Sequence, residues 1–205
     1  SGFLLRFAGR PFHSRLLADV IRRGGAARML QLIGLIERIT GTAGKVVAWV
    51  VLPLIFATCY EVFSRYLLNA PTIWAFEAGY MAMGVHALIG AAYTLQCHSH
   101  IRIDVLYSHF PERTKALIDV IGYLVLFFPA VIWLCIGLWE YWAEAFVSGE
   151  QSGQSAWNPV IWPFRLCFFA GYALLLLQGL AEVMKDILFL AGKTDHLQGD
   201  IKEKI

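Results

Sequence analysis

The chain has 205 residues, of which 58% are hydrophobic and only 16% charged, and its formal net charge is +2 at pH 7. Mean hydropathy is +0.59, whereas soluble domains are roughly 45–50% apolar and about 25% charged. This balance indicates a membrane protein, because a soluble chain of this size seldom buries so much apolar surface. The small charge, without a basic stretch interleaved with aromatics, excludes a nucleic-acid partner. Four widely separated cysteines without a CxxC spacing indicate neither zinc nor a disulfide framework.

The first 45 residues are basic and locally amphipathic. Apolar residues recur at helical spacing on both sides of Gly24-Gly25, and the second run ends at Gly41. Neither run is long or uniformly apolar enough to span a bilayer. We therefore expect two helices in the membrane interface. An arginine-rich, acid-poor start also fits a transit peptide, which is the alternative at this point.

Four apolar segments follow, each near the roughly 20 residues that a ~30 Å hydrocarbon layer requires. Their expected ranges are 46–68, 73–96, 116–141 and 160–181. The backbone within them should be helical, because lipid offers no other partner for amide groups. Pro53 and Pro129 fall inside spans and predict kinks there.

The predicted fold class is therefore an all-α membrane protein, with four transmembrane helices preceded by amphipathic interfacial helices. Three regions follow from this pattern: an N-terminal region of residues 1–45, a transmembrane domain of residues 46–181 and a tail of residues 182–205. The segments show no internal repeat and no matching pair of Gly/Pro-broken helices, so the signature of an autonomous transporter is missing.

Lysine and arginine beside the spans predict the orientation. They are frequent before the first span, between spans two and three and in the tail, while the connection from Trp142 to Pro159 has none. Both termini should then be cytoplasmic, with the connection Glu61–Glu77 and the Trp142–Pro159 segment on the far side. Aromatic residues around Trp142–Pro159 fit an interface, and this polar segment reads as a flexible solvated loop or as a recognition surface for a partner.

Charged residues at the far ends of the spans are the first candidates for a site. Glu61 and Arg65 stand four apart with the acid first, the favourable order for a helical ion pair. The pair could mark the membrane boundary or contact a partner. Glu77 follows Trp74 in the first turn of span two and could cap that helix. In an up-down-up-down bundle Arg165 reaches the same depth, so a network of Arg65 or Arg165 with Glu77 is expected.

Histidines are the candidates for a cofactor or metal. His86 lies near the middle of span two, and no second mid-depth histidine matches it as a haem ligand, so a helix-packing role is favoured. His98 and His100 stand two apart and would face different sides of a helix, which makes metal capture a weak prediction. No Walker loop, dinucleotide motif or serine–histidine–acid set is present. The sequence therefore predicts no catalytic, cofactor or metal residue and no enzyme.

Several groups of residues, taken in order, resemble the small membrane subunit of tripartite ATP-independent periplasmic (TRAP) transporters. These are Arg65-Tyr66-Leu67-Leu68-Asn69, Pro71 with Trp74 and Glu77, His100-Ile101-Arg102-Ile103-Asp104, Ser148-Gly149-Glu150, Trp162-Pro163 with Arg165, and Gly171 through Leu177-Gln178. The similarity extends from about Ala48 to Leu188. One departure is that relatives often carry paired acids after the tryptophan, where this chain has Phe76 before a lone Glu77.

The resemblance implies a role in the bacterial inner membrane. In such systems a periplasmic binding protein delivers an organic acid to two membrane subunits, and the large one carries the substrate and sodium sites. The small subunit is similar to a scaffold beside the large one and helps the binding protein dock. On this reading Arg65, Glu77 and Arg165 shape the periplasmic rim, and Glu61 and Trp74 are further candidates for contact with a partner. His100, Arg102 and Asp104 order the cytoplasmic hairpin.

Three other classes remain open from the residues alone. They are a four-helix electron carrier of cytochrome b type, a self-sufficient small transporter, and a membrane sensor or assembly factor. A haem spectrum from the purified protein would favour the first, and transport by the isolated chain would favour the second.

Overall fold

The computed structural model describes residues 12–97 and 110–191, and only the backbone of residues 12–26. Its elements are α1 (Phe12–Ala48), α2 (Val51–Leu67), α3 (Ala75–Gln96), α5 (Glu112–Gly122), the π-helical turn η1 (Tyr123–Phe127), α6 (Phe128–Ser148) and α7 (Trp162–Leu190). The described ranges contain one isolated antiparallel bridge, between Gln151 and Val160, and no strand. The predicted all-α class is confirmed.

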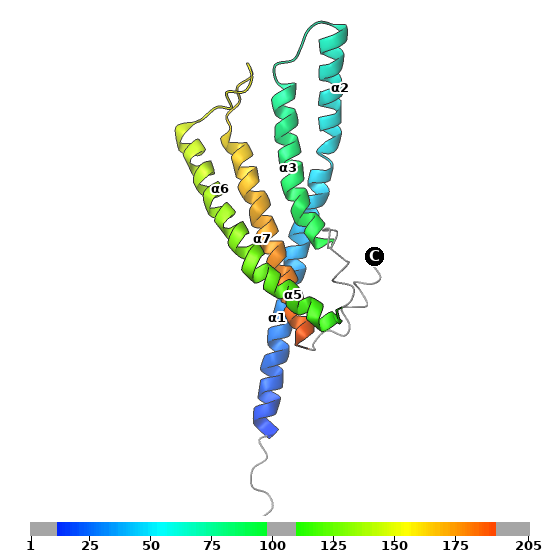
Figure 1. The fold of residues 1–205 in the computed structure, drawn as a ribbon, viewed down its shortest axis with the longest axis vertical. Helices are drawn as coiled ribbons and strands as arrows, with labels where there is room; N and C mark the ends of the chain where they lie inside the picture. The colour runs from blue at the N-terminus through cyan, green and yellow to red at the C-terminus, as the bar shows by residue number, and fades with distance from the viewer. Residues whose placement is uncertain (1–11, 98–109, 192–205) are drawn as a thin grey trace, which may run out of the picture.

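The helices run up and down side by side, with α7 at the centre (Figure 1). It contacts α3, α6, α1 and α5, whereas α2 packs mainly against α3. The α2–α3 and α6–α7 connections lie at the same end of the bundle, and α1 extends past the opposite end (Figure 1). We call these the loop end and the α1 end.

Three helical stretches of the described chain are long and apolar enough to cross a membrane: Ala27–Leu67, Glu112–Ser148 and Trp162–Leu190. Large apolar side chains point outward along them, such as Trp133, which is 75% exposed, as expected for lipid-facing positions. The chain is therefore an integral membrane protein. The 22 residues of α3 would span about 33 Å, but α3 is not one of the three candidate stretches. A fourth crossing stays a prediction.

The N-terminal region differs from the prediction. We expected two interfacial helices interrupted at Gly24-Gly25 and ending at Gly41, but α1 is one helix of 37 residues. Each glycine costs only about 1 kcal/mol relative to alanine in a helix, and no proline or capping residue stands beside the pair. The helix therefore continues through both glycines from its flanking turns. The expected boundary after residue 45 thus falls inside α1, and the boundary after residue 181 falls inside α7.

Helical hydrogen bonding changes near both prolines, where kinks were predicted. Helical hydrogen bonding changes at Trp49 and Val50, whose amides bond to carbonyls three residues back at 3.2 and 3.0 Å. Trp49 stands four residues before Pro53. The pyrrolidine ring of a proline crowds the carbonyl at this position, and the proline has no N–H group to donate to it. Val125 likewise stands four residues before Pro129, and it lies inside the π-helical turn η1.

Glycines allow the helices to approach closely. A Cβ atom on Gly44 of α1 would lie 2.5 Å from Tyr93 Cγ of α3. A Cβ on Gly171 of α7 would lie 2.9 Å from Leu88 Cβ of α3. Small residues at such crossings are typical of membrane bundles, where dispersion between close backbones stabilises the contact.

Candidate functional site

The predicted Glu61–Arg65 ion pair is present at the loop end. Arg65 Nε donates to Glu61 Oε1 at 2.9 Å, and the guanidinium Nη2 reaches the same oxygen. The other carboxylate oxygen of Glu61 accepts hydrogen bonds from the backbone amide of Thr72, at 2.9 Å, and from its hydroxyl. Glu61 therefore ties the last turns of α2 to the α2–α3 connection.

The connection itself is tightly folded. The Ala70 amide donates to the Ser64 carbonyl at 3.0 Å, in the manner of a helix C-cap. Asn69 supplies the left-handed conformation this needs, with a φ of 50°, and asparagine tolerates that region better than most residues. Trp74 then stacks on Tyr60 of α2, with ring centroids 6.4 Å apart. The predicted residue Trp74 thus joins the start of α3 to α2.

Arg165 forms a second cluster, and its partner is not the predicted one. Its Nη2 donates to Glu150 Oε1 at 2.8 Å, and its Nη1 donates to the Tyr141 carbonyl at 3.2 Å. The guanidinium carbon also lies 3.5 Å from the centroid of the Tyr141 ring, a cation–π contact. Arg165 is 6% exposed. The expected pairing of Arg165 or Arg65 with Glu77 is wrong, because each arginine has a carboxylate nearer in its own hairpin.

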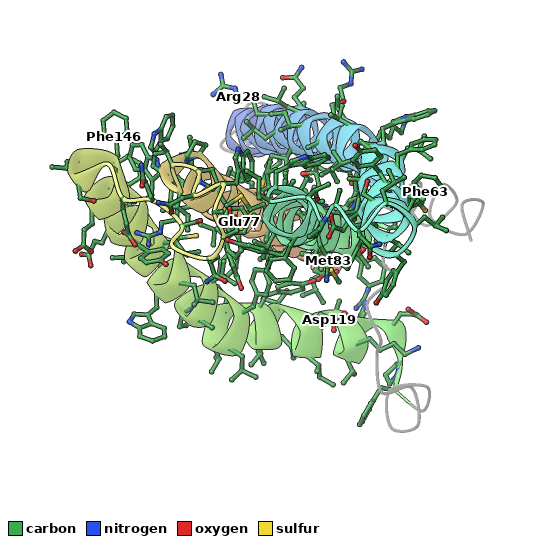
Figure 2. All side chains as sticks on the ribbon, turned by 90° about the horizontal axis from the view of Figure 1, so that it is seen from above. Arg28, Phe63, Glu77, Met83, Asp119 and Phe146 are labelled. Atoms are coloured by element: carbon green, nitrogen blue, oxygen red, sulfur yellow. The ribbon has the colours of Figure 1, made fainter. Side chains whose placement is uncertain are left out.

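Glu77 instead joins α3 to the α6–α7 connection. It is fully buried, and one carboxylate oxygen accepts a hydrogen bond from the Ser152 hydroxyl. Figure 2 shows Glu77 in the interior, with Phe63 and Phe146 at opposite outer sides of the bundle. Its Oε2 atom has no hydrogen-bond partner within the described part of the chain. Glu77 is therefore more than a helix cap.

The connection between α6 and α7 is an ordered loop rather than the flexible one we expected. Its two ends are joined by backbone hydrogen bonds, from the Ser152 amide to the Pro159 carbonyl at 2.9 Å and from the Ile161 amide to the Glu150 carbonyl at 3.0 Å. The Gly153 amide donates to Asn158 Oδ1 at 2.8 Å. These bonds and the two contacts to Glu77 and Arg165 hold the loop against the bundle.

His86 packs against the break between α1 and α2. Its Nδ1 lies 3.3 Å from the Val47 carbonyl, which also accepts a hydrogen bond from the Val50 amide. Because a carbonyl only accepts, this contact requires the proton on Nδ1. The geometry gives His86 the helix-packing role predicted for it.

A third polar group, at the α1 end, was missed. Lys185 Nζ of α7 bonds Glu182 Oε1 at 2.7 Å and Glu37 Oε1 of α1 at 3.2 Å. Gln178 Nε2 donates to Glu182 at 2.8 Å, and Gln96 Nε2 of α3 donates to the Glu37 carbonyl at 3.0 Å. We call these five residues the α1 clamp, because they join α1 to α3 and α7. Helical spacing of Gln178, Glu182 and Lys185 was the available signal.

The remaining predicted residues, His100, Arg102 and Asp104, lie outside the described residues. Elsewhere, within residues 27–97 and 110–191, no three histidine, cysteine, aspartate or glutamate side chains gather as metal ligands.

Comparison with known proteins covers the same part of the chain as this bundle. Residues 54–189 match the family model for the DctQ component of tripartite ATP-independent periplasmic transporters. The chain belongs to the DctQ family. It is also similar to the C4-dicarboxylate TRAP transporter small permease protein DctQ of Vibrio cholerae serotype O1 (strain ATCC 39315 / El Tor Inaba N16961), with 32% identity over 85 residues. That alignment covers 42% of this chain and 36% of the relative, so the chain spans about a third of the relative's length.

The DctQ match includes both loop-end clusters and the α7 side of the α1 clamp, and it begins after Pro53. All of α1, including Glu37, lies before it. The family is a transporter component and not an enzyme family, in agreement with the prediction from the sequence.

Proposed function

We propose that this chain is the small membrane subunit of a TRAP transporter in the bacterial inner membrane. It packs beside a large membrane subunit and helps a periplasmic binding protein dock. The complex takes up an organic acid together with sodium, and the name of the Vibrio relative points to C4-dicarboxylates. Sodium and substrate are bound by the large subunit. The DctQ match over residues 54–189 is the observation that carries this proposal.

The distribution of polar groups supports a scaffold. Among the described residues, the ion pairs of the bundle gather at its two ends: Arg65 and Arg165 with their acids at the loop end, and Lys185 with its acids at the α1 end. An ion pathway would need ionisable groups facing a cavity at mid-depth. Charges placed at both ends instead fix helix register, which suits a rigid buttress.

The loop end supports docking. Both far-side connections lie there (Figure 1). The hydrogen bonds that Ser152 donates to Glu77 and that Arg165 donates to Glu150 hold the larger connection in place. A preformed surface avoids the ordering cost that a flexible loop would add on binding. Exposed Gln154 and Trp157 stand on this loop, and tryptophan is a frequent anchor in protein interfaces. With both termini cytoplasmic, this surface faces the periplasm.

Uptake into proteoliposomes tests the proposal. The large subunit, this chain and the binding protein would be combined, and each would be omitted in turn. We expect sodium-driven uptake only with all three. The double variant Arg65→Ala plus Glu77→Ala should lower uptake about tenfold at limiting binding protein, because Glu61 loses its ion-pair partner and the α6–α7 connection loses its bond to α3.

The matched control is Glu144→Ala on α6, which removes an exposed acid at the same end. It should leave uptake unchanged. Uptake by the large subunit and binding protein without this chain would contradict the proposal, and so would full activity of the double variant.

A further inference from the structure

Three buried oxygen atoms, one on each of α1, α3 and α7, have no hydrogen-bond partner in the described part of the chain. They are Thr40 Oγ1, Gln96 Oε1 and Gln178 Oε1. Gln178 is fully buried and Thr40 is 1% exposed, whereas Gln96 is half-buried as a residue but its Oε1 atom is shielded from solvent. Buried polar atoms nearly always have a partner, because an unpaired one costs its whole desolvation penalty.

The register of α7 on α3 brings two of these side chains to one level. A Cβ on Gly171 would lie 2.9 Å from Leu88 Cβ, so these two residues stand opposite each other. Both helices begin at the loop end (Figure 1) and therefore run parallel. Seven residues further along each helix, about 10.5 Å, stand Gln178 on α7 and Leu95 on α3. Gln96 is the next residue of α3.

The register of α1 on α3 brings the third side chain to the same level. A Cβ on Gly44 would lie against Tyr93, and a Cβ on Gly41 would lie 3.4 Å from Gln96 Oε1, so the two helices run antiparallel. Thr40 precedes Gly41, and it stands four residues from Gly44 on the face that packs against α3. The hydroxyl and both amides therefore lie where α1, α3 and α7 contact one another.

Hydrogen bonds fix which end of each amide is left to find a partner. Gln178 Nε2 donates to the Glu182 carboxylate, and Gln96 Nε2 donates to the Glu37 carbonyl. Both of these groups accept in these contacts, so neither amide can be turned round. The two glutamines therefore each offer an acceptor oxygen, while the Thr40 hydroxyl can donate as well as accept.

We propose that one buried water molecule binds at this junction and joins the three helices. A water molecule donates two hydrogen bonds, which matches the two amide oxygens, and it accepts one from Thr40; buried waters typically make about three. A divalent cation does not fit, because it takes about six oxygens or more and Glu182 already binds the Lys185 ammonium group. The water adds a link to the α1 clamp. This inference requires only the packing of α1 on α3 and α7, and it is independent of the proposed transport.

Thr40→Val tests the site by the sign of its effect on thermal unfolding of the full chain in mild detergent. The change replaces the hydroxyl by a methyl group and removes no hydrogen bond between described side chains. With the water bound, it should lower the unfolding midpoint by about 2–4 °C, the effect of one hydrogen bond in a chain of this size. Without the water, it removes an unpaired buried hydroxyl and should raise the midpoint.

Thr42→Val is the matched control, because Thr42 is exposed on the same helix, and it should leave the midpoint unchanged. A high-resolution structure of the full chain should show one water within hydrogen-bond distance of all three oxygens. Thr40→Ser should keep that water and Thr40→Val should lose it.

An equal or higher midpoint for Thr40→Val would overturn the proposal. So would a high-resolution structure of the unaltered chain with a protein side chain, or no water, at the junction. Exchange of sodium for choline at constant ionic strength should leave the midpoint unchanged. A lower midpoint in choline would show that a cation occupies the site instead of water.

Discussion

Replacing Gly44 by alanine should destabilise the bundle at the crossing of α1 and α3. The new Cβ would lie 2.5 Å from Tyr93 Cγ and 2.6 Å from Tyr93 Cβ, whereas carbon atoms pack at about 3.5–4.0 Å. Rotation of the tyrosine ring cannot relieve this contact, because its Cβ is fixed to the α3 backbone. The helices would have to separate by about 1 Å, and overpacking of this kind costs about 1–3 kcal/mol.

Gly34→Ala is the matched control in the same helix, since a Cβ there meets nothing within 4 Å. Both changes gain the same helix propensity of up to about 1 kcal/mol, so the difference between them isolates the steric cost. Thermal unfolding in detergent, followed by circular dichroism, should place Gly44→Ala about 2–12 °C below Gly34→Ala, at about 2–4 °C per kcal/mol. Equal melting temperatures would refute the close approach of α1 and α3.

Three further changes probe the polar clusters. Lys185→Met removes the ammonium group that bonds Glu37 and Glu182. It should lower the free energy of unfolding by about 3–5 kcal/mol, measured as a lower unfolding midpoint. A midpoint equal to that of Lys185→Arg would contradict the α1 clamp. Arg165→Lys cannot keep both the Glu150 bond and the Tyr141 stack, so limited proteolysis should cut residues 149–161 several-fold faster, while unchanged cutting would show that Arg165 does not anchor the loop. A cysteine in place of Gln154 should react with a membrane-impermeant maleimide added outside the inner membrane, and labelling only after the cells are opened would reverse the proposed orientation.

Local spacing predicted the local contacts. The ion pair of Glu61 with Arg65 depends only on their spacing of four residues along one helix. The changes near Pro53 and Pro129 depend only on the backbone N–H group that each proline lacks. The ion pair is confirmed, and hydrogen bonding changes near the two prolines, while the predicted kinks stay a prediction. The pattern of apolar segments gave the membrane class for the same reason, because lipid imposes one length and one backbone conformation.

Contacts between distant segments could not be predicted from the sequence. Arg165 pairs with Glu150 because the α6–α7 loop folds back, and its hydrogen bonds form only when both helices are in place. Glu37 and Lys185 are 148 positions apart, and neither carries a local signal for the other. The continuous α1 was missed for a different reason: glycines permit a break in a helix but do not require one.

Co-purification with a large membrane subunit tests the central claim most directly. The tagged chain would be extracted in mild detergent from cells that express the whole transporter, and its partners would be identified by mass spectrometry. A scaffold subunit should bring the large, repeat-containing subunit with it in a fixed ratio. Recovery of this chain alone, with transport of a solute in the absence of any companion, would contradict the account.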